Sequence, residues 1–179
     1  MKKIVLAALL ASGLMAADSG VYVGVDLGNT AYDAKASAMG ISATEKDDGG
    51  SQTLKVGYYF DKNNRASAFF QNVNTSGGKT NIYGVGYDYL IGDNALKPFI
   101  GAILGHGSSK ADDNSVDLTG AVYGAQAGVN YSINENFSVE AGFRYMNSKM
   151  QDTIVVSGVD VKIEADPITN WFIGANYKF

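Results

Sequence analysis

The stretch that decides the fold is T169-N-W-F-I-G-A-N-Y-K-F179, at the very end of the chain. One side of an extended strand there would carry a row of mostly apolar residues: Trp171, Ile173, Ala175, Tyr177 and Phe179. Chain ends are commonly polar and frayed. An apolar, alternating end that stops on an aromatic residue therefore needs an explanation from the rest of the chain.

The same period-two alternation recurs in earlier segments and predicts eight strands in all. The seven earlier segments are 21–29, 53–61, 66–73, 81–90, 97–106, 121–131 and 137–146. Most are close to the roughly nine to eleven residues that a tilted strand uses to cross a bilayer. The chain has 22 glycines, 20 aromatic residues and only 2 prolines, which also favours strands.

The connections between these segments alternate between short and long. Residues 61–65, 91–96 and 132–136 are short and rich in turn-forming residues, whereas 31–50, 107–117 and 147–166 are expected to be long loops. Residues 74–79 are the one short member of the second set. This asymmetry is typical of transmembrane barrels. The predicted fold class is all-β, an eight-stranded antiparallel up-and-down transmembrane β-barrel with both chain ends on the short-turn side.

Alternation alone also fits a soluble eight-stranded barrel of the lipocalin kind, which buries its apolar row. The residues on the other side of each strand, the polar row, decide between a transmembrane and a soluble barrel. This row is mostly Gly, Ser, Asn and Gln. It has six charged residues: Asp26, Lys55, Asp88, Glu140, Arg144 and Lys178. Small residues suit the narrow interior of an eight-stranded barrel, whereas glycines weaken a strand that faces water. The apolar row is therefore predicted to face lipid.

Aromatic residues on the apolar row gather beside the short turns and at the chain end. They are Tyr58, Phe60, Tyr87, Tyr89, Tyr131, Phe137, Tyr177 and Phe179. Folded antiparallel, they would form a girdle at the level of the lipid headgroups. In lipid the last strand must pair with the first, because unpaired backbone groups there cost several kcal/mol. Phe179 would then complete the girdle.

The chain start is typical of a secretory signal. Residues 1–17 hold two lysines, then an apolar run, then small residues, and cleavage is expected after residue 16 or 17. The remaining chain, 18–179, is expected to be one barrel domain. It has twelve basic residues against eighteen acidic ones, so nucleic acid is not an expected partner. With no cysteine, disulfides and lipoprotein anchoring are excluded.

The final strand, from Trp171 to Phe179, resembles that of the small eight-stranded outer-membrane barrels, the family of OmpX, NspA and the membrane domain of OmpA. The segment K97-P-F-I-G-A-I-L-G105 is similar to a frequent strand pattern of that family. The resemblance implies a place in the bacterial outer membrane, in contact with its lipid. It also implies that the barrel assembly machinery reads the terminal aromatic, Phe179, within the aromatic set Trp171, Tyr177 and Phe179.

Charges inside a lumen need partners. We expect an ion-pair network that plugs the barrel, formed by Asp26, Lys55, Asp88, Glu140 and Arg144. Asp26, Lys55 and Arg144 are expected higher in the barrel than Glu140 and Asp88. The alternative is a wet, narrow channel for small solutes, which conductance would reveal. The facing of two strands stays open at Phe69, Phe70, Phe99 and Ile103.

Residues 151–167 predict a hairpin with a tight turn that extends beyond the membrane. Its free strand edges favour addition of another strand, so residues 147–166 are predicted to bind an extracellular partner or host surface. The expected function is a monomeric structural anchor that displays loops for surface interaction or adhesion.

Other chemistry has weak support in the sequence. The sole histidine, His106, lies near Ser108 and Ser109 at a barrel rim, where a lipid-modifying enzyme would place such residues. No residue stands out as the carboxylate that would orient the histidine, so no enzyme is predicted. The acidic segments 45–50 and 110–117 lack the ordered spacing of a metal site. We predict no catalytic residues, no cofactor and no metal.

Overall fold

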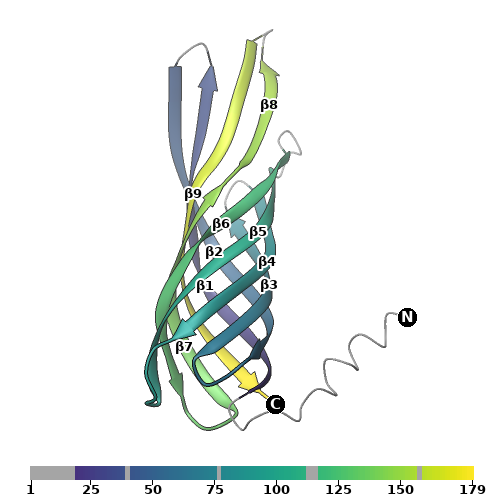
Figure 1. Cartoon of the computed structure of the whole chain (residues 1–179). Coiled ribbons are helices and arrows are strands. Elements are labelled where there is room, and N and C mark those ends of the chain that lie inside the picture. The colour runs from purple at the N-terminus through teal and green to yellow at the C-terminus, as the bar shows by residue number, and fades with distance from the viewer. Residues whose placement is uncertain (1–18, 39–40, 76–77, 112–116, 157–158) are drawn as a thin grey trace, which may run out of the picture.

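The computed structural model describes residues 19–38, 41–75, 78–111, 117–156 and 159–179. It is one antiparallel sheet closed on itself (Figure 1). The strands are β1 (Gly20–Ala38), β2 (Ile41–Tyr59), β3 (Asn64–Thr75), β4 (Gly78–Leu90), β5 (Leu96–Ala111), β6 (Asp117–Ser132), β7 (Phe137–Ser148), β8 (Met150–Val156) and β9 (Val159–Lys178). In these ranges the structure has no helix that is both long and apolar enough to cross a membrane.

The barrel wall has eight strands because β8 continues β7 beyond Lys149, and both pair with β9. The sheet closes where β1 pairs with β9, in a register that sets Tyr22 opposite Lys178. The backbone N–H of Phe179 also donates to the carbonyl of Val21 (2.9 Å). The predicted eight-stranded up-and-down barrel is thus confirmed. The expected signal peptide, residues 1–17, lies outside the described residues.

The two rows of each strand lie on opposite sides of the wall. On the outside, Leu27, Val85 and Ile173 are each more than half exposed. On the inside, Tyr22, Asp26 and Phe172 are buried. The outer face of the wall is therefore apolar, and the charged side chains of the strands point inward, as predicted.

The structure also settles the facing of β3 and β5. Phe70 is 46% exposed on the outside, whereas Phe69 packs against the buried cluster inside. Phe99 and Ile103 are buried in the lumen with exposed fractions of 1% and 5%. They share the inner side with Gly101, so β5 carries large apolar residues on both faces. Alternation of polarity could not assign such a strand.

The three short turns lie at the end of the barrel that also holds the C-terminus (Figure 1). In the first turn, Asp61 accepts hydrogen bonds from the backbone N–H groups of Asn63 and Asn64 (2.7 and 2.8 Å). The bond from Asn63 contributes most to holding the pKa of the Asp61 carboxyl below its ordinary value. In the second turn, Gly92 has φ of 95°, a conformation that glycine adopts without strain.

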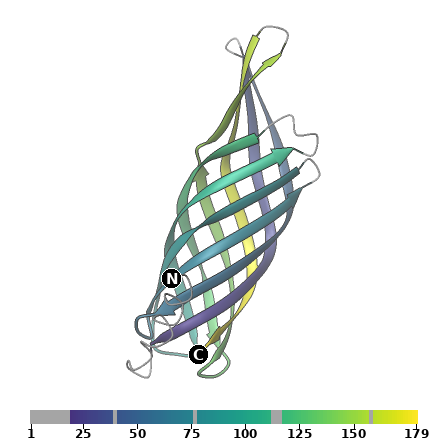
Figure 2. The ribbon, with the colours of Figure 1, turned by 90° about the vertical axis from the view of Figure 1, so that its right-hand side faces the viewer.

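At the opposite end of the barrel, the prediction that residues 31–50 form a long loop is wrong, because these residues are largely strand. β1 and β2 continue as a hairpin up to the pair Ala38 and Ile41. The predicted hairpin in 151–167 is confirmed as β8 and the upper part of β9. The two hairpins also pair with each other, with Lys35 opposite Glu164 in register. They form a four-stranded extension, in the order β2-β1-β9-β8, that stands above the barrel (Figures 1 and 2).

The β1–β9 register shifts by one residue between Tyr32 and Ala34. On β9 the extra residue falls at Asp166 and Pro167, between the partners Ala165 and Ile168. A bulge of this kind bends a strand and moves the following residues to the other face. Proline suits the position because it has no N–H to donate to the ladder.

Candidate functional site

Glu140, on β7, lies at the centre of the lumen and joins two cations from other strands. Its Oε1 is 2.5 Å from Lys55 Nζ, and its Oε2 is 2.9 Å from Arg65 Nη1. Asn176 Nδ2 donates a further hydrogen bond to Oε2 (2.9 Å). Glu140 and Arg65 are buried, and Lys55 is almost fully buried. The carboxylate therefore ties β2, β3 and β9 to β7.

Two more carboxylates extend this cluster. Asp26 bridges Lys55 (2.7 Å) and Arg144 (2.5 Å), and Asp88 pairs with Arg65 (2.9 Å). The network thus contains three cations and three anions: Lys55, Arg65, Arg144, Asp26, Asp88 and Glu140. Its formal charge is zero, and all six side chains are buried. Mutual pairing is what makes such burial tolerable.

The five charged residues predicted for the lumen all lie in this network. The expected division by height is not seen, because Lys55 joins Asp26 to Glu140 directly. Sequence reasoning missed Arg65, which was assigned to a turn. The predicted set had one negative charge in excess, and that imbalance was the available signal for a further buried cation.

Amides and rings complete the network. Gln126 donates to Asp88 and accepts from Arg144 Nε (2.9 Å). The Arg144 guanidinium lies 3.8 Å from the ring centre of Phe172. Arg65 lies between 5.3 and 5.8 Å from the ring centres of Tyr22, Tyr59 and Phe99. These contacts add cation–π attraction in a desolvated setting.

Two glycines leave room for the carboxylates. A Cβ at Gly101 would overlap Oδ1 of Asp88, and one at Gly174 would overlap Oδ1 of Asp26. Glycine in the polar row is thus a packing requirement of the ion network at these two positions.

Apolar side chains fill the lumen above the ions. One buried cluster consists of Ile82, Ile103, Leu118, Val122, Met146 and Ile168. Met146 is two residues beyond Arg144 on β7, toward the four-stranded extension. A second, smaller cluster of Leu90, Phe99 and Phe172 lies nearer the short turns. In the described residues, packed side chains thus interrupt the lumen at several levels.

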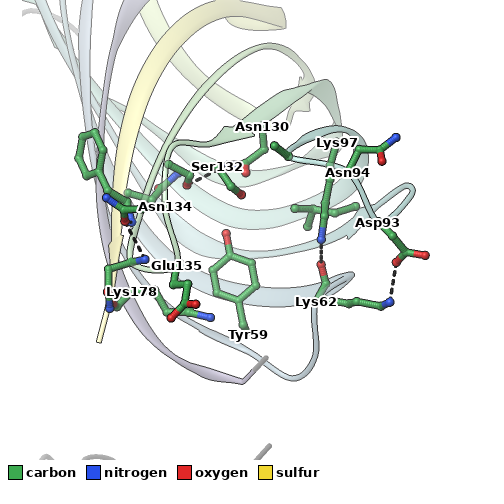
Figure 3. Close-up of a pocket in the computed structure, with 16 residues that line it drawn as sticks. Tyr59, Lys62, Asp93, Asn94, Lys97, Asn130, Ser132, Asn134, Glu135 and Lys178 are labelled. Carbon is green, nitrogen blue, oxygen red and sulfur yellow. Dashed lines mark hydrogen bonds and ion pairs between the residues drawn. The ribbon is translucent and has the colours of Figure 1, made fainter. Parts of the chain in front are cut away.

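A pocket of about 560 Å³ opens at the short-turn end, below these layers (Figure 3). Its wall mixes polar side chains, such as Asn130 and Lys178, with apolar ones, such as Leu90 and Phe137. At its rim Lys62 pairs with Asp93 (2.6 Å), and Lys97 donates to the carbonyl of Lys62 (2.7 Å). The hydrogen bond and charge of Lys62 lower the pKa of Asp93 below its ordinary value. The pocket is a wet vestibule that ends on the packed lumen.

The three aromatic residues of the final strand that were predicted for the girdle and the assembly signal lie on the outside of β9 and at its end. Trp171, Tyr177 and Phe179 are 55%, 46% and 68% exposed. The rings of Tyr177 and Phe179 meet edge to face with centres 5.1 Å apart. Tyr58 and Phe60, at the end of β2 and just beyond it, make a similar pair with ring centres 5.6 Å apart.

His106 and Ser108 share one face of β5, because they are two residues apart on the strand. The His106 ring packs on Tyr83, with ring centres 5.5 Å apart. Ser109 is three residues away on β5, hence on the other face of the sheet, and bonds to Thr80 (2.8 Å). Among the described residues, no group of three His, Cys, Asp or Glu side chains could hold a metal ion. Part of the acidic segment 110–117 lies outside those residues.

Several solved structures of outer-membrane barrels have a shape similar to that of this chain. The chain is 23% identical to Neisserial surface protein A, with a TM-score of 0.63, covering 90% of this chain and 99% of that one. It is 17% identical to the outer membrane protein OprG from Pseudomonas aeruginosa, with a TM-score of 0.60 and coverage of 90% and 97%. It is 23% identical to outer membrane protein H from P. aeruginosa, with a TM-score of 0.56, covering 89% of this chain and 99% of that one. At such identities the likeness shows the fold.

Comparison with curated protein sequences finds no match. The model of the outer membrane protein β-barrel domain matches residues 4–179, almost the whole chain. This match agrees with the closed sheet, its outward apolar row and its inward charges. The chain therefore belongs to the outer-membrane β-barrel family, and its place is the bacterial outer membrane.

Proposed function

We propose that the protein is a non-enzymatic anchor with a plugged lumen that displays its four-stranded extension for contact with other surfaces. The observation that carries this proposal is the pairing of the two long hairpins, which share the ladder between β1 and β9 up to Ser37 and Lys162. A hairpin alone is only marginally stable, whereas four paired strands on a barrel support one another. The extension is therefore a stable structural element that can serve as a binding surface.

The lumen supports the same role. The ion network and the apolar cluster above it are buried side chains packed inside the barrel, which supports a plugged lumen. A channel for small solutes would need a continuous wet path, and a charge-neutral, fully paired network offers passing ions no vacant partner. We therefore rank conduction second. The vestibule at the short turns, which is open at one end and partly lined by polar side chains, is the observation that keeps conduction a candidate.

Export and insertion complete the proposal. Residues 1–17 act as a cleaved signal peptide, and Phe179 with Trp171 and Tyr177 serves the assembly machinery as the terminal signal. Exposure of all three rings on the outside of β9 supports this role, because a receptor must reach them. A monomer in its own membrane suits a sheet that closes without a second chain.

Shortening the extension tests the display role. Gln151 and Glu164 are opposite in register, so residues 152–163 can be replaced by Asn-Gly, which forms a tight hairpin turn. We expect bacteria that carry this variant to lose adhesion to matrix-coated glass and to cell monolayers, while the barrel keeps its heat-modifiable gel mobility. Asp93→Ala, at the opposite end, is the control. Unchanged adhesion with an inserted barrel would remove the proposal.

A further inference from the structure

The four-stranded extension has two outer edges, one on β2 and one on β8. Above the pair Gly49 and Thr75, residues 41–48 of β2 pair only with β1 among the described strands. On β8, the last described pair with β6 joins Thr119 and Gln151. Among the described residues, 152–156 pair only with β9. Each edge presents a row of backbone groups that can accept another strand.

The two edges differ in sequence. The β2 edge includes Glu45, Lys46, Asp47 and Asp48, and charged residues on an edge strand discourage further pairing. The β8 edge has one charged residue, Asp152, and then four that are uncharged and β-branched: Thr153, Ile154, Val155 and Val156. Short segments with high β propensity, low charge and no proline are the ones that readily add strands. The β8 edge is therefore the receptive one.

We propose that the β8 edge pairs antiparallel with the β8 edge of a second copy held in an opposing membrane. This inference rests on the display role proposed above and names the partner. A two-fold axis at Ile154 sets Ile154 opposite Ile154 and Thr153 opposite Val155. Every copy carries this β-branched partner strand, and cross-strand pairs of β-branched residues stabilise a ladder. The interface is the same patch on both copies, so the contact closes at two.

The direction of β8 decides where the second copy lies. The extension rises from the barrel end opposite the C-terminus, and β8 runs along it (Figures 1 and 2). Two copies in one membrane have both β8 strands rising, and a two-fold axis along the membrane normal keeps them parallel. The antiparallel pair needs an axis across the strands, which inverts the second copy. The contact therefore joins two membranes.

The experiment uses the purified full chain in two populations of liposomes with different dyes, and measures clustering by energy transfer between them. We expect wild-type liposomes to cluster. Ile154→Lys in both populations reduces clustering to the protein-free level, because like charges lie directly opposite. Mixing Ile154→Lys liposomes with Ile154→Glu liposomes restores clustering, which also shows that both variants are folded. Thr44→Lys, on the β2 edge, is the matched control and leaves clustering unchanged.

Three results would overturn the inference: wild-type liposomes that stay apart, Ile154→Lys liposomes that cluster like wild type, or no recovery on mixing the opposite charges. If wild-type liposomes stay apart while shortening the extension still abolishes adhesion, the edge pairs with a strand of another protein. The display role then stands and the homotypic contact falls. Loss of clustering in Thr44→Lys would assign the contact to β2 instead.

Discussion

Glu140→Gln is expected to lower the free energy of unfolding by about 3–5 kcal/mol. Glu140 is 3% exposed and neutralises both Lys55 and Arg65. Glutamine keeps the shape and can still bond to the neighbouring amides, but it leaves one positive charge unbalanced in the lumen. The measurement is urea unfolding in lipid or detergent, followed by the fluorescence of Trp171.

Glu135→Gln is the matched control for this change. Glu135 lies in the exposed turn between β6 and β7, where the same loss of charge should alter stability by less than about 0.5 kcal/mol. If the two substitutions have equal effects, the lumen network does not contribute to stability in the way described. The double variant Glu140→Gln with Lys55→Met should recover part of the loss, because it restores neutrality.

Val85→Arg is expected to cost about 2–4 kcal/mol, the cost of a cation at the middle of the lipid face. Val85 lies midway along β4 and is 56% exposed on the outside of the wall. In water, such exposure would make arginine nearly neutral, so the prediction depends on what surrounds the side chain. Equilibrium unfolding in lipid vesicles measures the difference.

Ile91→Arg is the control, because Ile91 is 45% exposed just beyond the end of β4. Near the membrane surface the cost falls to about 0–1 kcal/mol. The difference in free-energy cost between arginine at position 85 and at position 91 thus reports the depth of each position in the bilayer, because the two native side chains have similar exposure. Equal costs at both positions would contradict the assigned membrane level.

Much of the fold was predictable because one physical signal runs through it. A strand between lipid and a narrow lumen must alternate, so Val85 and Gly86, or Ile173 and Gly174, reveal their sides directly. The extension was not predictable from that signal. In residues 31–50 the alternating residues include alanines and mixed charges, and residues 31–37 pair with β9, which is far away along the chain. Such a contact is long-range and leaves no local pattern.

For the lumen site, the sequence predicts which charged residues face inward better than it predicts which of them pair. Asp26, Lys55, Asp88, Glu140 and Arg144 are charged residues within otherwise small polar rows, which marks them as lumen-facing. Arg65 follows a turn of polar residues, where a cation is unremarkable, and only the register of β3 places it opposite Asp88. Pairing across five strands depends on the shear and tilt of the barrel, which alternation does not report.

The central claim is that hydrocarbon surrounds the outward row, and the single tryptophan tests it most directly. Trp171 is 55% exposed on the outside of β9, opposite Asn29 and Phe143 in the neighbouring strands. In vesicles of lipids brominated on the acyl chains, its fluorescence should be strongly quenched, with little added quenching by aqueous iodide. Strong iodide quenching without an effect of bromine would contradict the account.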